Sequence, residues 1–150
     1  MENSLKAILM AAGVVVTLIV VSIGFLLMRS GQNTAQNAIN KLGQVNAELE
    51  ESQYTMYDKV EVSGAEVVNA LKKFENEYIG IQVKTNKNTS GEWYIYNGSG
   101  DSLTSTTGNI TNTMDEKSIE YVNPNGKFTG EIKRDSNGTI IAITFKQKVN

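Results

Sequence analysis

The sequence predicts an α+β protein: one long N-terminal helix, apolar in its first half and amphipathic in its second, packed on a small antiparallel sheet of four or five strands plus one short helix. Three observations support this. Residues 7–28 carry no charge and no proline, residues 34–50 repeat apolar side chains at helical spacing, and residues 78–149 alternate apolar and polar side chains between turns. The chain therefore divides into an N-terminal flank (1–6), an apolar helix (7–28), its amphipathic continuation (29–52) and a solvent-exposed domain (53–150).

The apolar segment runs from Ala7 to Met28 and is bracketed by Lys6 and Arg29. At about 1.5 Å per residue it forms a helix of about 33 Å, enough to cross a hydrocarbon layer of about 30 Å. A cleaved secretory signal is disfavoured because its apolar core is usually about 7 to 15 residues long. A core helix of a soluble domain is disfavoured because a chain of 150 residues cannot easily surround so long an apolar helix. Two alternatives stay open: a single membrane span, or a helix buried among copies of itself.

Beyond Arg29 the sequence turns polar, and its apolar residues recur three and four positions apart, which predicts an apolar stripe on a helix. The helix is expected to run unbroken from about residue 4 to about residue 52 if Gly31 and Gly43 are tolerated. The alternative is a break near Gly31, because each glycine costs about 1 kcal/mol relative to alanine. The stripe consists of Ile39, Leu42, Val45 and Leu49.

A second, shorter helix is expected at about residues 65–76. Ser63-Gly-Ala-Glu66 fits a capping box, in which a serine hydroxyl and a glutamate carboxylate each accept a hydrogen bond from a free backbone amide at a helix start. Apolar residues then continue one face of this helix at Val67, Leu71 and Phe74. The preceding segment, residues 54–62, is expected to be a connector with some strand character.

Strands are expected at residues 78–85, 92–96, 118–122, 127–134 and 139–148, as an antiparallel meander. The turns Asn123-Pro-Asn-Gly126 and Asp135-Ser-Asn-Gly138 contain Asn-Gly, a strong hairpin signal. One face of such a sheet needs an apolar cover. We therefore expect the stripe and the apolar face of the short helix both to pack on it. On the sheet side the expected contacts are Ile79 or Ile81, Trp93 or Tyr94, Ile132, Ile141, Ile143 and Phe145.

Composition excludes several kinds of site. The chain has no cysteine and no histidine, which excludes disulfides, thiolate or histidine metal ligands and histidine-based catalysis. A net charge of -2 gives no field that attracts nucleic acid. Asp101, Asp115 and Glu116 lack the spacing of a calcium loop, and pairs such as Glu50 and Glu51 read as surface charges. We expect no enzyme activity, no cofactor, no metal and no nucleic-acid partner.

The layout resembles type IV pilins and the related pseudopilins and tight-adherence pilins. The match comprises residues 7–28 as the apolar half of the helix, 34–50 as its amphipathic half and 78–149 as the sheet. The resemblance implies a subunit that polymerises with its own copies into an extracellular filament, passes through the cell membrane during export and uses a pilus assembly machinery. Glu2 takes the place of the family's N-terminal glutamate, which the resemblance implies pairs with the terminal amine of a neighbouring subunit. The family's leader, a basic segment ending in glycine, does not precede the apolar segment, so we expect either that it has been removed or that this chain is not a processed pilin.

Small residues in the apolar segment favour close packing between copies. Gly13, Thr17 and Gly24 recur four and seven positions apart on one face, with Ala7 and Ala11 nearby on the preceding turns. Faces of this kind let helices approach closely in a bilayer. We expect these residues and Glu2 to form the contacts between subunits.

The alternative function is a single-pass anchored protein whose extracytoplasmic domain binds or assists a partner without polymerising. In that case Gly13→Leu leaves function intact, because lipid accommodates a larger side chain. Lys6 and Arg29 nearly balance across the apolar segment, so the flanking charges do not determine its orientation. Under both hypotheses we expect the C-terminal domain outside the cytoplasm, because it is rich in Asn and Thr.

Overall fold

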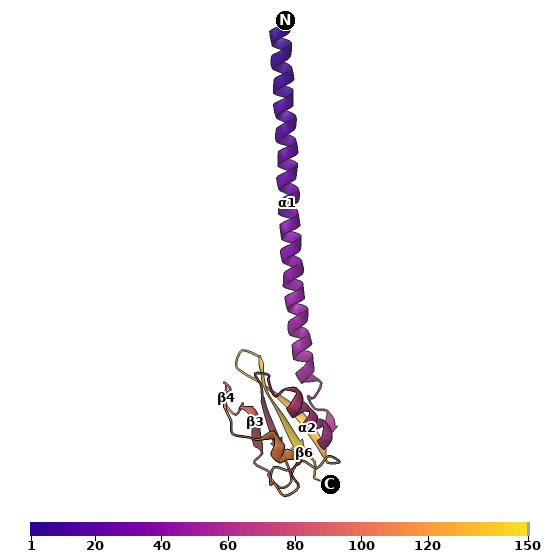
Figure 1. The fold of residues 1–150 in the computed structure, drawn as a ribbon, viewed down its shortest axis with the longest axis vertical. Coiled ribbons are helices and arrows are strands. Elements are labelled where there is room, and N and C mark those ends of the chain that lie inside the picture. Colours follow the sequence, from indigo (N-terminus) through magenta and orange to yellow (C-terminus); the bar gives the residue numbers. More distant parts are fainter. Residues whose placement is uncertain (150) are drawn as a thin grey trace. The chain divides into compact units, whose positions relative to one another are not determined.

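The computed structural model describes residues 1–149 and forms two compact units, Met1–Glu48 and a second that begins at Leu49. We call residues 49–149 the head. Six strands and two α-helices confirm the α+β class, with more strands than the four or five predicted (Figure 1). In chain order the elements are α1 (Glu2–Thr55), β1 (Glu61–Ser63), α2 (Gly64–Lys73), β2 (Gly80–Lys84), β3 (Glu92–Asn97), β4 (Thr104–Ser105), the 3-10 helix η1 (Ile110–Met114), β5 (Lys127–Arg134) and β6 (Ile140–Gln147).

Helix α1 is unbroken over 54 residues and contains no buried residue. Gly31 and Gly43 lie within it without interrupting it, so the alternative of a break near Gly31 is not found. The absence of proline and the many Ala, Leu, Glu and Gln residues after Arg29 explain why the helix continues into its polar half. The helix ends in a turn in which the N–H of Tyr57 donates to the carbonyl of Tyr54 at 3.1 Å.

The head contains one sheet with the strand order β1-β5-β6-β2-β3-β4. It is mostly antiparallel, as predicted, but β2 and β6 run parallel, with Ile81 opposite Ile143. The predicted antiparallel meander is wrong at this point, because it did not place β6 beside β2. The chain leaves β3 through β4 and η1 and returns through the β5–β6 hairpin, which brings β6 beside β2 in the same direction.

The β5–β6 hairpin forms where its turn sequence predicts it. The carboxylate of Asp135 accepts hydrogen bonds from the N–H groups of Asn137 and Thr139 at 2.9 and 2.8 Å. Gly138 adopts a positive φ of 85°, a conformation that glycine reaches without steric cost. Asp135 and Gly138 therefore set the turn between the two longest strands of the sheet.

The strand predicted at residues 118–122 is wrong, because this segment forms consecutive turns. Long-range contacts hold it there: the N–H of Val122 donates to the carbonyl of Thr113 at 2.9 Å, and the hydroxyl of Tyr94 donates to Glu120 at 3.1 Å. Burial and the nearby Glu120 charge raise the pKa of Tyr94, so its hydroxyl keeps its proton and serves as a donor.

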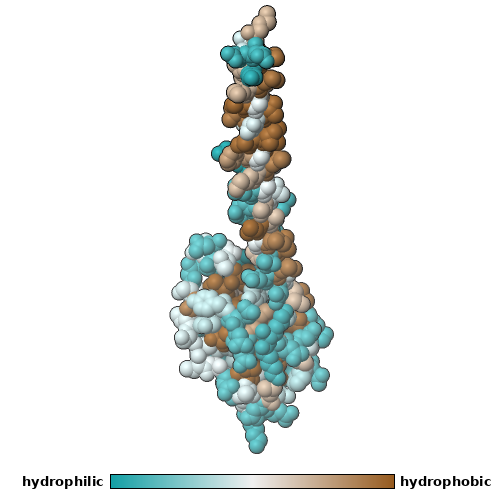
Figure 2. Space-filling model, turned by 45° about the horizontal axis from the view of Figure 1, so that its top comes forward, coloured by the Kyte–Doolittle hydropathy of each residue, from teal (hydrophilic) through white to brown (hydrophobic). Residues whose placement is uncertain are grey.

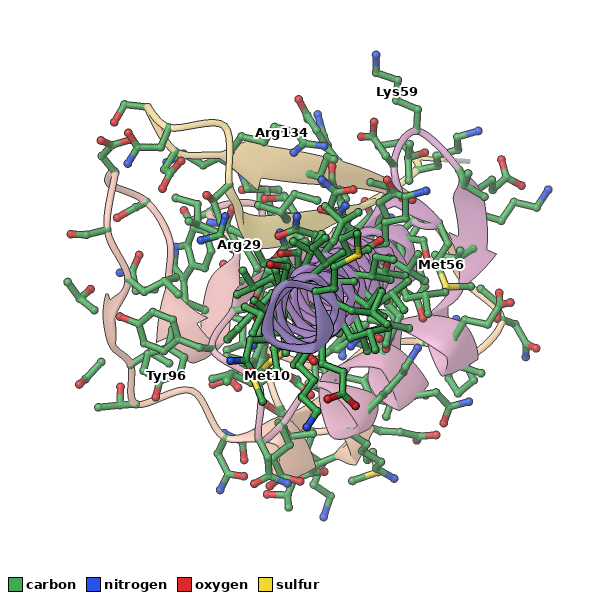
Figure 3. The ribbon with its side chains drawn as sticks, turned by 90° about the horizontal axis from the view of Figure 1, so that it is seen from above. Met10, Arg29, Met56, Lys59, Tyr96 and Arg134 are labelled. Atoms are coloured by element: carbon green, nitrogen blue, oxygen red, sulfur yellow. The ribbon has the colours of Figure 1, made fainter. Side chains whose placement is uncertain are left out.

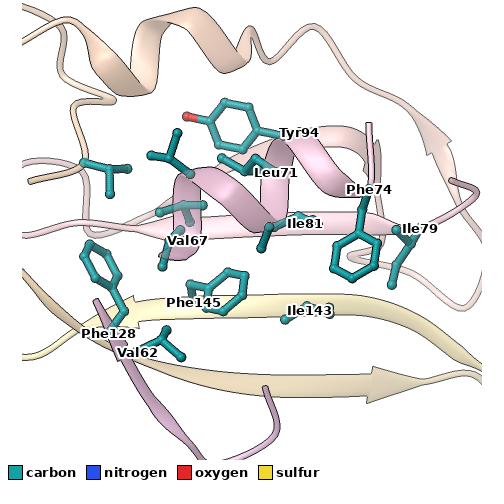
Figure 4. Close-up of a cluster of buried hydrophobic side chains, with 14 residues drawn as sticks. Val62, Val67, Leu71, Phe74, Ile79, Ile81, Tyr94, Phe128, Ile143 and Phe145 are labelled. Carbon is teal, nitrogen blue, oxygen red and sulfur yellow. The ribbon is translucent and has the colours of Figure 1, made fainter. Parts of the chain in front are cut away.

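Helix α2 covers one face of the sheet and forms the core of the head with it (Figure 4). Its capping box is present as predicted: Ser63 Oγ accepts from the N–H of Glu66 at 3.3 Å, and a Glu66 carboxylate oxygen accepts from the N–H of Ser63 at 2.7 Å. Its three predicted core residues, Val67, Leu71 and Phe74, are buried. The expected sheet residues Ile79, Ile81, Tyr94, Ile141, Ile143 and Phe145 are also buried, and Ile132 and Trp93 are partly buried.

Three residues of the stripe, Ile39, Leu42 and Val45, belong to the first unit, so their expected packing on the sheet stays a prediction. Leu49 belongs to the head and is 58% exposed there. Within the head, α2 covers the apolar face of the sheet, together with two tyrosines near the end of α1. The ring of Tyr54 lies 5.1 Å from that of Phe74, and the ring of Tyr57 lies 5.5 Å from that of Phe145.

Both edges of the sheet are short, because β1 has three residues and β4 has two. Beyond β1, the Asp58 carboxylate accepts from the N–H of Ile132 at 3.2 Å, so a side chain continues the pairing of β5. Beyond β4, the hydroxyl of Thr106 donates to the carbonyl of Trp93 at 2.9 Å. Asp58 and Thr106 thus form hydrogen bonds with backbone groups of β5 and β3 that the short edge strands do not pair.

Candidate functional site on the N-terminal helix

The apolar half of α1 is the largest exposed apolar surface of the first unit. Large side chains between residues 8 and 28 are 48–73% exposed, and hydrophobic residues cover much of the face of the helix that Figure 2 shows. Figure 3 views the helix along its axis, with Met10 and Arg29 pointing away from it. Among residues 1–149, α1 is the one helix long and apolar enough to cross a membrane by length and composition. Exposed apolar surfaces of this extent mark contacts with lipid or with other proteins.

The hydroxyl groups in and near this apolar surface bond to the helix itself. Thr17 Oγ1 donates to the carbonyl of Gly13 at 2.8 Å, and Ser22 Oγ donates to the carbonyl of Leu18 at 2.7 Å. Thr34 makes the same kind of bond four residues back, at 2.9 Å. Such bonds satisfy polar groups without water, so neither Thr17 nor Ser22 prevents the segment from entering lipid or a dry protein interface.

An unbroken helix fixes how the predicted packing residues lie around its axis. At about 100° per residue, Thr17 and Gly24 lie within about 40° of Gly13, so these three share a face as expected. Ala7 and Ala11 do not join it, because their offsets place them about 120° and 160° away. They form a separate small pair, one turn apart, on another side of the helix.

The two glycines of this face border open space. A Cβ atom built on Gly13 or Gly24 meets no atom within 4 Å. Within the described residues, their lack of a side chain therefore relieves no clash, although each costs helix stability relative to alanine. Gly13 and Gly24 would allow a second helix to approach α1 closely.

Glu2 is exposed in the first turn of α1, where a carboxylate interacts favourably with the positive end of the helix dipole. It lies about 20° from Gly13 around the axis, on the face of the small residues. Lys6 follows four residues later, a spacing at which a glutamate and a lysine attract each other on a helix surface.

The head contains an open hollow whose lining is mostly uncharged. The hollow has a volume of about 460 Å³ and is lined by Glu75, Ile95 and residues 106–111, and Glu75 is the one charged residue among them. Ile95 has a positive φ of 69°, which strains a β-branched residue. Of the threonine hydroxyls in this lining, that of Thr106 donates to the carbonyl of Trp93 at 2.9 Å.

Two of the three carboxylates considered as calcium ligands, Asp101 and Asp115, accept hydrogen bonds from groups of the head. The Asp101 carboxylate accepts from the N–H and hydroxyl of Ser136 at 2.8 and 2.7 Å, and these bonds hold the pKa of Asp101 below its usual range. Asp115 accepts from the N–H of Lys117 at 3.0 Å. Over residues 1–149 no three acidic side chains gather where a metal ion would bind.

Sequence reasoning missed Tyr54 and Tyr57, the residues that join the end of α1 to the core of the head. The available signal was their spacing of three residues directly after the stripe, which places both rings on one side of a helical turn.

Comparison with known proteins adds no relative to these observations: no family model, no curated protein and no solved structure matches the chain. The function is therefore argued from the geometry of α1 and the head.

Proposed function

We propose that this chain is a structural subunit that polymerises through its N-terminal helix into an extracellular filament. The observation that carries the proposal is the apolar half of α1, an all-round apolar helix with internally bonded hydroxyls and glycines that its own fold does not need. Copies of such a helix gain van der Waals contacts when small faces meet. The helix-plus-sheet layout, which resembles that of pilins, supports the same assignment.

In this proposal the chain first resides in the cell membrane and then moves into the filament, with the help of an assembly machinery. Residues 7–28 exchange lipid contacts for contacts with other copies, through Gly13, Thr17 and Gly24. The head lies outside the cytoplasm and faces solvent. The dense core and polar surface of the head are compatible with that environment.

Glu2 sets the register between subunits in this proposal. A carboxylate that enters an apolar interior needs a partner charge or must take up a proton. The terminal amine of a neighbouring subunit supplies that charge, and Lys6 lies on the same face as a second cation.

The second candidate is a single-pass anchor whose extracytoplasmic head binds or assists a partner without polymerising. The length of Ala7–Met28, about 33 Å as a helix, favours it, because that length matches one crossing of a bilayer. The two functions differ in what covers the small face: lipid in the anchor, another copy in the filament.

Gly13→Leu separates them. In cells that produce the full chain, surface material is sheared off, viewed by negative-stain microscopy and analysed by intact mass. We expect the wild-type chain in filaments and at least tenfold less of the Gly13→Leu chain, because leucine keeps the small faces apart. Gly43→Leu is the matched control: it makes the same change on the same helix, about 120° from Gly13.

Normal filaments with Gly13→Leu, or wild-type chain that stays monomeric in the membrane at every expression level, contradict the proposal and favour the anchor. The fluorescence of Trp93, the single tryptophan, reports whether the head of each variant is folded.

A further inference from the structure

The polar half of α1 carries an apolar seam with a seven-residue period. Gly31, Ala35, Ala38, Leu42, Val45 and Leu49 follow each other at steps of four and three residues, and we call these six residues the distal seam. Steps of this kind place Ala35, Leu42 and Leu49 at the first position of a heptad and Gly31, Ala38 and Val45 at the fourth. A seven-residue apolar repeat is the pattern of helices that supercoil left-handedly around one another.

The distal seam continues the small face of the apolar half. Thr17 and Gly24 precede Gly31 at steps of seven residues, so the fourth heptad position is small or apolar from Thr17 to Val45. Arg29, at the boundary of the two halves, falls outside the seam. A contact between helices that begins in the apolar half therefore extends into the polar half without a change of face.

Lipid does not explain the distal seam. Leu49 lies 20 residues beyond Arg29, about 30 Å farther along the helix, out of reach of the lipid around residues 7–28. Leu49 is 58% exposed in the head, where α2 covers the apolar face of the sheet, and Leu42 belongs to the first unit, in which no residue is buried. A further helix is the cover that a heptad pattern fits.

We propose that the distal seam packs in parallel against the distal seams of other copies of this chain, as a left-handed bundle of three or more helices. The inference rests on the proposed self-assembly and adds a second contact outside the apolar segment. Before the copies leave the membrane, insertion of residues 7–28 holds them parallel and at the same height, so identical heptad positions meet there. Leucine at the first position with a β-branched residue at the fourth, as in Leu42 and Val45, favours more than two helices.

The flanks of the distal seam are compatible with this arrangement. In a parallel bundle Lys41 and Glu48 lie next to Asn46 and Gln53 of the neighbouring copy, so no like charges meet. Side-chain size grows along the seam from Gly31 to Leu49, and the distance between helix axes grows with it. The helices are therefore closest near Gly31.

The experiment uses the absence of cysteine from the chain, since each single substitution introduces the only thiol. Full-length Ala38→Cys and Leu42→Cys chains are oxidised in membranes and in sheared filaments and read on non-reducing gels. Ala47→Cys is the matched control, because Ala47 lies about 160° from Gly13, on the opposite side of the helix. Thr17→Cys reports contact within the apolar half.

We expect disulfide dimers of Ala38→Cys and Leu42→Cys at least tenfold above those of Ala47→Cys. If Thr17→Cys crosslinks while Ala38→Cys and Leu42→Cys do not exceed Ala47→Cys, the distal contact is wrong and the proposed function stands. If none crosslinks, both are wrong. Adducts with a protein of another mass at Ala38→Cys overturn the assignment to copies of this chain.

The double variant Leu42→Cys/Val45→Cys tests the number of helices. In a bundle of three or more, its two thiols join different neighbours and give covalent products larger than the dimer. In a two-helix arrangement both thiols meet the same partner, and the dimer is the largest covalent product. If no product larger than the dimer forms, the bundle of three or more helices is wrong.

Discussion

The glycines of α1 and several glycines of the head have opposite surroundings. A Cβ atom on Gly13 or Gly24 meets open space, whereas one on Gly64 or Gly130 overlaps the carbonyl of Asn123 or Tyr57. At Gly64 and Gly130, glycine is needed because another part of the same chain passes too close for a side chain. Gly13 and Gly24 have no such neighbour within the first unit.

The same contrast holds for large apolar residues. Phe74, Phe128 and Phe145 are at most 1% exposed in the head, while no residue of α1 is buried. The head therefore has an apolar core of its own, whereas the first unit has none. Substitutions in the two regions should separate stability from assembly.

Truncation of a buried ring tests this contrast most strongly. Phe74→Ala should destabilise the head by about 3–5 kcal/mol, because it leaves a cavity beside Tyr54 and Tyr57. Leu42→Ala, on the exposed stripe, should change head stability by less than about 0.5 kcal/mol. Denaturant unfolding of the full chain in detergent, followed by Trp93 fluorescence, measures both. Equal effects of the two substitutions would show that α1 contributes to the core of the head.

A glycine pair sharpens the comparison. Gly130→Ala should destabilise the head by about 1–3 kcal/mol, because the added methyl overlaps the carbonyl of Tyr57 and forces the backbone apart. Gly13→Ala should leave the unfolding of the head unchanged and increase the stability of α1 by up to about 1 kcal/mol. Thermal unfolding read by Trp93 fluorescence and by far-UV circular dichroism distinguishes the two outcomes. A destabilised head in Gly13→Ala would contradict the separation.

The smallest expected effect concerns pH. Hydrogen bonds from Ser63 lower the pKa of Glu66, so the folded head binds this proton less readily than the unfolded chain. The stabilisation is present above the ordinary glutamate pKa of about 4.3 and is lost as the pH falls through the lower value of the folded state. Glu66→Gln removes this dependence. The difference in Tm between wild type and Glu66→Gln should therefore shrink from pH 7 to pH 3, and a constant difference would rule out Glu66 as its source.

Local signals were read correctly from the sequence. The capping box at Ser63 and Glu66 and the turn at Asp135 and Gly138 each depend on residues within a few positions of one another, so their chemistry is visible in a short window. The long helix was visible because nothing in its sequence interrupts it.

Long-range choices were not visible. The parallel pairing of β2 with β6 joins residues such as Gln82 and Thr144, 62 positions apart, and no local pattern encodes it. Residues 118–122 alternate like a strand, but the hydrogen bond between Tyr94 and Glu120 keeps them in turns. The stripe on α1 is real as a pattern, yet amphipathicity alone does not say which surface covers it.

The candidate site was predictable in part for the same reason. Helical spacing places Gly13, Thr17 and Gly24 on one face of α1. Ala7 and Ala11 are close to them in sequence but lie on another side of the helix. Tyr54 and Tyr57 contact partners in α2 and β6, so their role depends on the tertiary fold.

The brevity of β1 and β4 has a consequence for crowding. Domains displayed at high density risk joining through unpaired strand edges, the route by which sheets aggregate. Edges of three and two residues, backed by Asp58 and Thr106, leave few peptide groups for a foreign strand. Many such heads can stand side by side and stay separate.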